Sequence, residues 1–348
     1  MARTGGASVT AGPTLAVVAR EAGVSVPTAS KVVNGREDVA PATRRRVTEA
    51  LDRLGYVRRP RFDTGRAPRL VDLVVDSLEG PGSGAVLHGV EGAARAAGLE
   101  VVVSAALGRD GSAGPPERGW LDRLVTRGSC GVLFHLTELS AAQYAWLRQH
   151  RVPFVTIDPV REPPPGVVSV GATNWQGGVT ATEHLLSLGH ERIAVLAGPR
   201  RTMPSDARVA GYRSALSAAG IAHRPEYVRH AAATEPTARR RTHELLDLPE
   251  PPTALFACSD RMALGAYQAL AERGLRVPGD VSVIGFDDRP EARWLTPPLT
   301  TIRQPLSEMA ATALTLLLRL MDDHHPESTR TELSTRLVQR ASTARPRA

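Results

Sequence analysis

The sequence predicts two fold classes in one chain: an all-α N-terminal domain with a helix-turn-helix, then a two-lobed α/β domain with parallel sheets. Residues 14–35 contain two short amphipathic segments joined by a glycine turn. From Leu70 onward, short apolar runs alternate with amphipathic segments of helical length. The formal charge of +7 lies entirely in residues 1–69, which hold 13 basic and 6 acidic residues and leave 30 of each for the rest of the chain.

The helix-turn-helix prediction depends on agreement between caps, turn and apolar face. Thr14 is suited to cap the first helix, whose apolar residues share one face: Leu15, Val18, Ala19 and Ala22. Gly23 lies where the chain must reverse, and Ser25 is placed to cap a second helix that tolerates Pro27 in its first turn. The alternative, a helical hairpin without a DNA-binding role, does not require all these features together.

A third helix and a linker complete the N-terminal part. Residues 41–54 form an amphipathic segment that Gly55 would stop, with Tyr56 folding back on the bundle. The basic residues of its first turns, Arg44 among them, suit phosphate contacts. The predicted bounds are a disordered tail at 1–13, a helix-turn-helix domain at 14–58, a basic linker at 59–69 and the α/β domain at 70–348.

The alternating pattern of the second part predicts parallel sheets with helices on both faces. The expected strands are residues 71–75, 100–104, 131–134, 154–158, 167–170, 193–196, 254–258 and 281–286. The expected helices are residues 85–97, 117–127, 141–150, 175–188, 207–219, 238–246, 261–273 and 306–321. We expect an N-lobe at about 70–160 and 290–320, a C-lobe at about 162–288 and 325–345, and a ligand crevice at the carboxyl ends of the strands.

Composition limits the function classes. The confined positive charge indicates a polyanionic partner for the N-terminal part, whereas a merely solvated basic tail would not explain why the charge stops at the second domain. No apolar run is long enough to span a bilayer and no signal peptide is apparent, so we expect a cytoplasmic protein without a membrane partner. Cys130 and Cys258 lie in apolar strand-like contexts, typical of buried reduced thiols.

Catalytic signatures are missing from the sequence. No glycine-rich dinucleotide motif, phosphate-binding loop or metal-spaced His/Cys set is present, and Ser259 lacks a nucleophile elbow. The sequence therefore predicts no enzyme, no cofactor and no metal. Two alternatives stay open: a sugar- or nucleoside-acting α/β enzyme, and a solute-binding protein, which the basic head and missing signal peptide disfavour.

The ordered motifs of the chain resemble the lactose-repressor/galactose-repressor family of bacterial transcriptional regulators. They are the helix-turn-helix, LGY at 54–56, GATNWQGG at 171–178, HLLSLGHERI at 184–193, RVAGY at 208–212, SDRMALG at 259–265, VPGDVSVIGFDD at 277–288 and PLTTIRQ at 298–304. The resemblance implies a homodimer, in some members a tetramer. It also implies that residues 70–348 of this chain are an effector-binding and dimerisation domain of the type I periplasmic-binding-protein-like fold.

The resemblance also implies which residues touch operator DNA. The matching positions are Ser25, Val26, Pro27, Thr28, Ser30, Lys31, Asn34 and Arg44. Lys31 can donate to guanine O6 or N7, and Val26 can touch a thymine methyl group. A dimer would set two such helices on half-sites about 34–36 Å apart, so a palindromic double-stranded operator is expected.

Effector contacts carried over by motif position lie at strand and helix ends. The expected set is Glu79, His135, Asp158, Thr202, Arg208, Asp260, Asp287 and Gln304. Carboxylates and an arginine fork suit the adjacent hydroxyls of a sugar. For Asp260 and Asp287 the alternative is helix capping or strand-end turn chemistry. For Arg208 we favour ligand contact, because an arginine at a helix start opposes the helix dipole and gains nothing structurally.

Two departures from the family pattern are visible. Aromatic residues that family members often carry near Gly82 and Ser83, and near 231–233, are missing, so Trp175 and Trp294 are the remaining stacking candidates, with packing as the alternative. Residues 58–66 lack the family's Ala-Arg-x-Leu hinge and are typical of a mobile basic tether, the alternative being that Phe62 acts as a wedge in the minor groove. We expect a ligand-controlled repressor whose effector is a mono- or oligosaccharide, such as a plant glycan fragment.

Overall fold

The computed structural model describes residues 14–33, 36, 38–54, 56, 69–78, 82–106 and 118–347. The predicted tail at 1–13 and nearly all of the predicted linker at 59–69 lie outside these residues. The chain divides into two units, Met1–Ala67 and Pro68–Ala348.

The first unit is a three-helix bundle, as predicted. Its helices are α1 (Leu15–Glu21), α2 (Val26–Val33) and α3 (Pro41–Leu54). Small apolar side chains from all three helices and both connections form its core: Val18, Ala19, Ala22, Ala29, Val32, Val39, Val47 and Ala50. Gly23 has φ of +63°, the left-handed turn that the sequence required. Thr14 does not cap α1 with its side chain; its carbonyl accepts the first helical hydrogen bonds instead.

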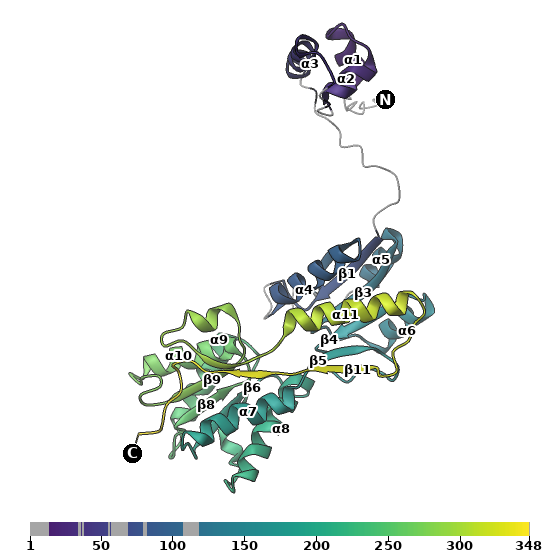
Figure 1. Ribbon diagram of the computed structural model, residues 1–348. Coiled ribbons are helices and arrows are strands. Elements are labelled where there is room, and N and C mark those ends of the chain that lie inside the picture. The colour runs from purple at the N-terminus through teal and green to yellow at the C-terminus, as the bar shows by residue number, and fades with distance from the viewer. Residues whose placement is uncertain are drawn as a thin grey trace, which may run out of the picture. The chain divides into compact units, whose positions relative to one another are not determined.

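The second unit contains two sheets, each covered by helices on both faces (Figure 1). The N-lobe strands are β1 (Arg69–Val75), β2 (Leu99–Ala105), β3 (Ser129–His135), β4 (Phe154–Ile157), β5 (Ser169–Ala172) and β11 (Arg330–Leu333). They are parallel and ordered β11-β5-β4-β3-β1-β2. The helices of this lobe are α4 (Ser83–Ala96), α5 (Arg118–Arg127), α6 (Ala141–Gln149) and α11 (Leu306–Met321).

The C-lobe repeats this arrangement in the order β12-β10-β9-β8-β6-β7. Its strands are β6 (Ile193–Ala197), β7 (Val228–His230), β8 (Ala254–Ala257), β9 (Ser282–Asp287), β10 (Thr300–Arg303) and β12 (Arg336–Val338). Its α-helices are α7 (Asn174–Ser187), α8 (Met203–Ala218), α9 (Glu235–Leu246) and α10 (Asp260–Glu272). All pairs are parallel except β10 with β12.

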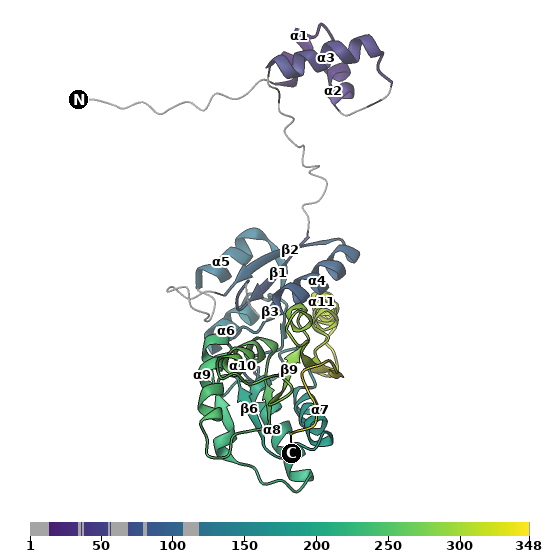
Figure 2. The ribbon, with the colours of Figure 1, turned by 90° about the vertical axis from the view of Figure 1, so that its left-hand side faces the viewer.

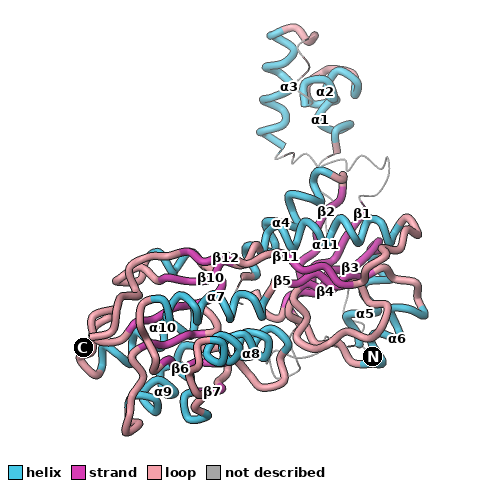
Figure 3. The backbone as a smooth tube through the Cα atoms, turned by 60° about the horizontal axis from the view of Figure 1, so that its bottom comes forward, coloured by secondary structure: helices cyan, strands magenta, loops and turns pink. Residues whose placement is uncertain are grey.

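Separate apolar clusters lie on the two faces of each sheet. In the N-lobe, α4 and α11 pack side by side on one face, whereas α5 and α6 cover the other (Figure 2). In the C-lobe, α7 and α8 cover one face, and α9 and α10 the other (Figure 3). Burial on both faces explains why the central strands are continuous apolar runs in the sequence.

The predicted lobe boundaries were wrong at three places. The strand expected at 167–170 lies at Ser169–Ala172 and belongs to the N-lobe sheet rather than the C-lobe. Residues 300–303 pair in the C-lobe, and residues 330–333 pair in the N-lobe, the reverse of the expected assignment. The chain therefore crosses between lobes after β5, after β10 and after β11, because strand pairing rather than sequence order decides lobe membership.

Candidate functional site

Seven of the eight predicted DNA-contacting residues are described, and they lie just before α2, on α2 and on α3. Val26 and Pro27 are exposed at the start of α2. Ser25 Oγ accepts from the backbone N–H of Thr28 at 3.3 Å and so caps α2, and it lies 2.8 Å from the Thr28 hydroxyl. Ser30 is half-buried on the same helix. Asn34 lies outside the described residues.

Two basic candidates have partners within the bundle. Lys31 Nζ lies 2.7 Å from the carboxylate of Asp38, and both side chains are exposed. This pair lowers the pKa of Asp38, chiefly through the hydrogen bond from Lys31. Arg44 donates to the carbonyl of Arg36, which ties α3 to the segment after α2. An exposed ion pair contributes at most about 1 kcal/mol, so Lys31 can exchange Asp38 for a stronger anionic partner.

A second candidate site is a cavity of about 270 Å³ between the lobes, which we call the interlobe cavity. It lies where β3, β4, β8, β9 and β10 end, the edge at which ligands bind in open parallel sheets. Six of the eight predicted effector residues line it: His135, Asp158, Thr202, Arg208, Asp287 and Gln304. Glu79 lies outside the described residues.

Arg208 is the centre of a buried polar network at this cavity. Its Nε donates to Asn174 Oδ1 at 2.8 Å, and its Nη1 donates to the carbonyl of Cys258. Its Nη1 lies 3.7 Å from Asp287 Oδ1, and its guanidinium stacks 3.7 Å from the centre of the Phe286 ring. The expectation that Arg208 gains nothing structurally was therefore wrong. Because α8 begins at Met203, Arg208 lies beyond its first turn.

Two carboxylates share this single arginine. Burial raises the pKa of Asp158, an effect opposed by Arg208 and by Asn174, whose Nδ2 donates to Asp158 at 3.4 Å. Burial raises the pKa of Asp287 to about 6, although Arg208 and the Gln304 amide, which donates at 2.6 Å, oppose the shift. Both aspartates have positive φ, 48° and 113°, an unusual conformation for a residue other than glycine.

The cavity also contains buried polar atoms without a hydrogen-bond partner among the described residues. They are Asp76 Oδ1, both ring nitrogens of His135, Ser205 Oγ and Gln304 Oε1. His135 is only 1% exposed, and burial lowers its pKa to about 4, so its ring is neutral near pH 7. An unpaired buried polar group costs about 1–3 kcal/mol, and a ligand with hydroxyl groups can supply the missing partners.

Asp260 does not line the interlobe cavity. Its carboxylate accepts from the Thr301 hydroxyl at 2.6 Å and from the backbone N–H of Arg289 at 2.7 Å. Ser259 caps α10 by accepting from the Met262 N–H at 3.2 Å. The structural alternative for Asp260 is therefore the one that the geometry supports, although Asp260 joins the start of α10 to β10 and to the β9–β10 connection rather than capping α10.

Sequence reasoning missed three polar residues of the site. Asp76 follows β1 directly, and Ser205 lies in the first turn of α8. A polar residue directly after a strand, or in the first turn of the helix that follows a strand, lies near the carboxyl edge of the sheet. The local sequence contains this signal for both residues. Asn174 contacts the network from the start of α7, inside the motif at 171–178 that contributes to the family resemblance.

The two cysteines differ in their surroundings. Cys258 is buried at the cavity, and burial raises the pKa of its thiol to about 12, whereas Cys130 is half-buried rather than buried as predicted. Among the described residues, no group of three or more His, Cys, Asp or Glu side chains is arranged to hold a metal ion. Within the described part of the chain, no helix combines the length and apolar character needed to cross a bilayer.

Comparisons with known proteins agree with the two units. Residues 14–59 match bacterial regulatory proteins of the lacI family, and residues 182–343 match the periplasmic binding protein-like domain. The chain is 32% identical to the HTH-type transcriptional repressor CytR of Escherichia coli (strain K12), over 95% of this chain and 96% of that protein. It is 35% identical to the HTH-type transcriptional regulator CelR of Thermobifida fusca, over 95% and 98%.

Solved structures show the same relationship. A complex of the transcriptional regulator CelR with cellobiose has a TM-score of 0.71 and 34% identity, covering 95% of this chain and 99% of that one. The lac repressor dimer bound to operator and the anti-inducer ONPF has a TM-score of 0.70 and 29% identity, covering 96% and 100%. The three-helix head, the two-lobed α/β fold and the end-to-end similarity lead to one conclusion: the chain belongs to the lacI family of bacterial regulatory proteins.

Proposed function

We propose that this protein is a transcriptional repressor that binds a palindromic operator as a homodimer. Its affinity for the operator changes when a small neutral polyhydroxylated effector occupies the interlobe cavity. One observation carries the proposal: a basic helix-turn-helix and a cavity with unpaired buried polar atoms occur in one chain. Because its partner would be chromosomal DNA, the protein would work in the cytoplasm.

The DNA-binding half of the proposal is supported by charge and exposure. Positive charge that is confined to residues 1–69 draws this part of the chain to phosphates, with an affinity that falls as salt rises. Val26 and Pro27 are exposed on α2, and Lys31 is held only by an exposed ion pair. These residues would enter the major groove, while Arg44 and the arginines after it contact the backbone.

The class of effector follows from the cavity lining. Arg208 is the only cation among the described lining residues, and Asn174, Cys258 and Asp287 already occupy it. Three carboxylates line the same cavity, so a phosphate or carboxylate on the ligand would meet repulsion without a free positive partner. Unpaired acceptors and the neutral His135 suit hydroxyl groups instead. The volume of about 270 Å³ favours a ligand of monosaccharide size.

Effector control requires that the ligand bind one lobe arrangement more tightly than another. The cavity is suited to this requirement because its polar residues come from both lobes: Asp76, His135 and Asp158 from the N-lobe, Arg208 and Asp287 from the C-lobe. A ligand that bridges them would stabilise one relative position of the lobes. The relatives carry the names of regulators and not of enzymes, and we propose that this chain likewise performs no catalysis.

The proposal is tested by fluorescence anisotropy with the labelled DNA upstream of its own coding region and an unrelated fragment of equal length. We expect tighter binding to the upstream DNA, a linear fall of log affinity with log salt, and a change in affinity when a neutral monosaccharide from a panel is added. Lys31→Ala should reduce discrimination between the fragments. Arg319→Ala, on α11 of the other unit, is the matched control. Equal affinity for the two fragments at every salt concentration would contradict the proposal.

A further inference from the structure

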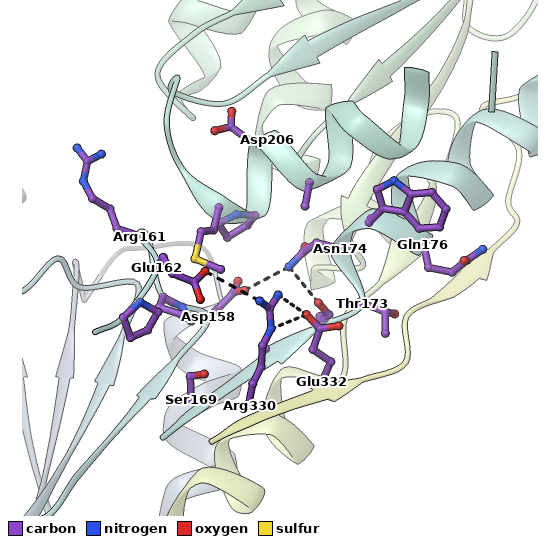
Figure 4. Close-up of a pocket in the computed structure, with 18 of the residues that line it drawn as sticks. Asp158, Arg161, Glu162, Ser169, Thr173, Asn174, Gln176, Asp206, Arg330 and Glu332 are labelled. Carbon is purple, nitrogen blue, oxygen red and sulfur yellow. Dashed lines mark hydrogen bonds and ion pairs between the residues drawn. The ribbon is translucent and has the colours of Figure 1, made fainter. Parts of the chain in front are cut away.

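A larger cleft lies beside the interlobe cavity and has no role in the function proposed above. This second cleft has a volume of about 770 Å³ and receives residues from both lobes (Figure 4). Its sides are the segment after β4, the first turns of α7 and α8, the edge strand β11 and its neighbour β5. We call it the edge cleft.

The floor of the edge cleft is a polar sheet face with an open centre. Ser169 pairs with Arg330 and Gly171 pairs with Glu332 in the β5–β11 register, so all four residues share one face of the sheet. Arg330 donates to Glu332 at 2.6 Å and lies 4.0 Å from Glu162 (Figure 4). A Cβ atom added at Gly171 would meet nothing within 4 Å. The floor therefore offers planar hydrogen-bonding groups around an unfilled space.

One wall of the edge cleft carries an exposed aromatic ring. Trp175, in the first turn of α7, lines the cleft and is 48% exposed. Gln176 follows it, and Asp206 faces the cleft from α8. An indole half out of water beside carboxylate, guanidinium and amide groups is the combination that binds the apolar face and the hydroxyl edge of a sugar ring.

We propose that the edge cleft is a second ligand site, which binds a neutral oligosaccharide of about two to three sugar units. The volume is nearly three times that of the interlobe cavity, which favours a longer ligand there. The Trp175 ring is the stacking platform, and the Arg330–Glu332 pair and Gln176 bind hydroxyl groups. Arg330 is paired with Glu332 and Glu162, and the lining carries three arginines against four carboxylates, so the site has no net positive charge for an anion.

The position of the edge cleft links it to the interlobe cavity. Asp158 and Pro204 line both spaces. Asp158 also accepts a hydrogen bond from Asn174, which in turn accepts from Arg208. A ligand in the edge cleft would touch both lobes and bias their relative position, so it would change DNA affinity; this consequence, unlike the binding itself, rests on the proposed function.

The binding is tested by calorimetry on the full chain with cellotriose, maltotriose and xylotriose. We expect saturable binding of at least one trisaccharide, weakened tenfold or more by Trp175→Ala and by Gly171→Val. Valine suits a β-strand, and its Cβ at position 171 would meet nothing within 4 Å, so the added side chain takes up space on the open floor. Thermal unfolding of both variants checks that they fold. Ser205→Ala, which alters only the interlobe cavity, should leave trisaccharide affinity within twofold.

Three outcomes would overturn the second site. One is no saturable binding of any trisaccharide up to about 10 mM, an affinity too weak for a specific site. Another is binding that Trp175→Ala and Gly171→Val leave intact in folded protein. The third is equal loss of binding in Ser205→Ala, which would assign the sugar to the interlobe cavity. None of these measurements involves DNA, so they test the second site even if the protein proves not to be a repressor.

Discussion

The neutral, buried ring of His135 gives the sharpest quantitative prediction. Its pKa falls from an unfolded value of 6.5 to about 4 because burial penalises the charged form. Between these values the unfolded chain takes up a proton that the folded chain refuses, so the free energy of unfolding decreases as pH falls from 7 towards 4. At pH 5 this single group lowers the stability by about 2 kcal/mol relative to pH 7.

The perturbation is His135→Gln, which removes the titrating ring and keeps a polar side chain. Urea unfolding at pH 7 and pH 5 is followed by tryptophan fluorescence, because all four tryptophans lie beyond residue 69 and report only on the α/β domain. Wild type should lose about 2 kcal/mol more than the variant over this interval. His324→Gln, at an exposed position after α11, should behave like wild type. Identical pH dependence of wild type and His135→Gln would refute the reasoning.

Three further predictions follow from close contacts and charge. Gly178→Ala places a Cβ 2.2 Å from the Arg208 carbonyl oxygen, so urea unfolding should show a free energy of unfolding about 1–3 kcal/mol lower than in wild type. Gly92→Ala, whose Cβ meets nothing within 4 Å, should not lower it. Equal effects of the two substitutions would contradict the packing argument. In calorimetry, any monosaccharide that binds should bind at least tenfold more tightly than its phosphate ester, and Asp76→Asn should reduce this affinity ratio. A phosphate ester that binds more tightly than the free sugar would contradict the proposed effector class. Asp38→Ala frees Lys31 and removes a negative charge, so anisotropy at low salt should show tighter DNA binding; weaker binding would indicate that the ion pair positions α2.

Much of the candidate site was predicted through the family resemblance, and part of it agrees with a general property of parallel sheets. Asp158 and Asp287 end apolar strands, and parallel topology brings such ends to one edge, where the interlobe cavity lies. The predicted start of α8 is four residues too late, because Pro204 disfavours a helix interior although proline is tolerated in a first helical turn. The start of α9 was missed for the same reason at Pro236.

Short strands at or next to the sheet edges escaped prediction because they carry no clear pattern. β7, β10, β11 and β12 have three or four residues each. β11 and β12 are separated by two residues yet join different sheets. β11 joins the N-lobe sheet because it pairs with β5, more than 160 positions earlier in the chain. No local pattern in residues 325–345 contains that information, which is why the lobe boundaries were misassigned.

The amino-acid sequence alone determined the separate basic head, the α/β character of the rest and the family, because these depend on local periodicity, turn residues, charge and ordered motifs. Only the tertiary structure decided which strands share a sheet, that Arg208 is held by Asn174 and Asp287, and that Asp260 binds Thr301 rather than lining the cavity. These facts depend on side chains that meet from distant segments, and burial of their polar atoms is a property of the folded chain alone.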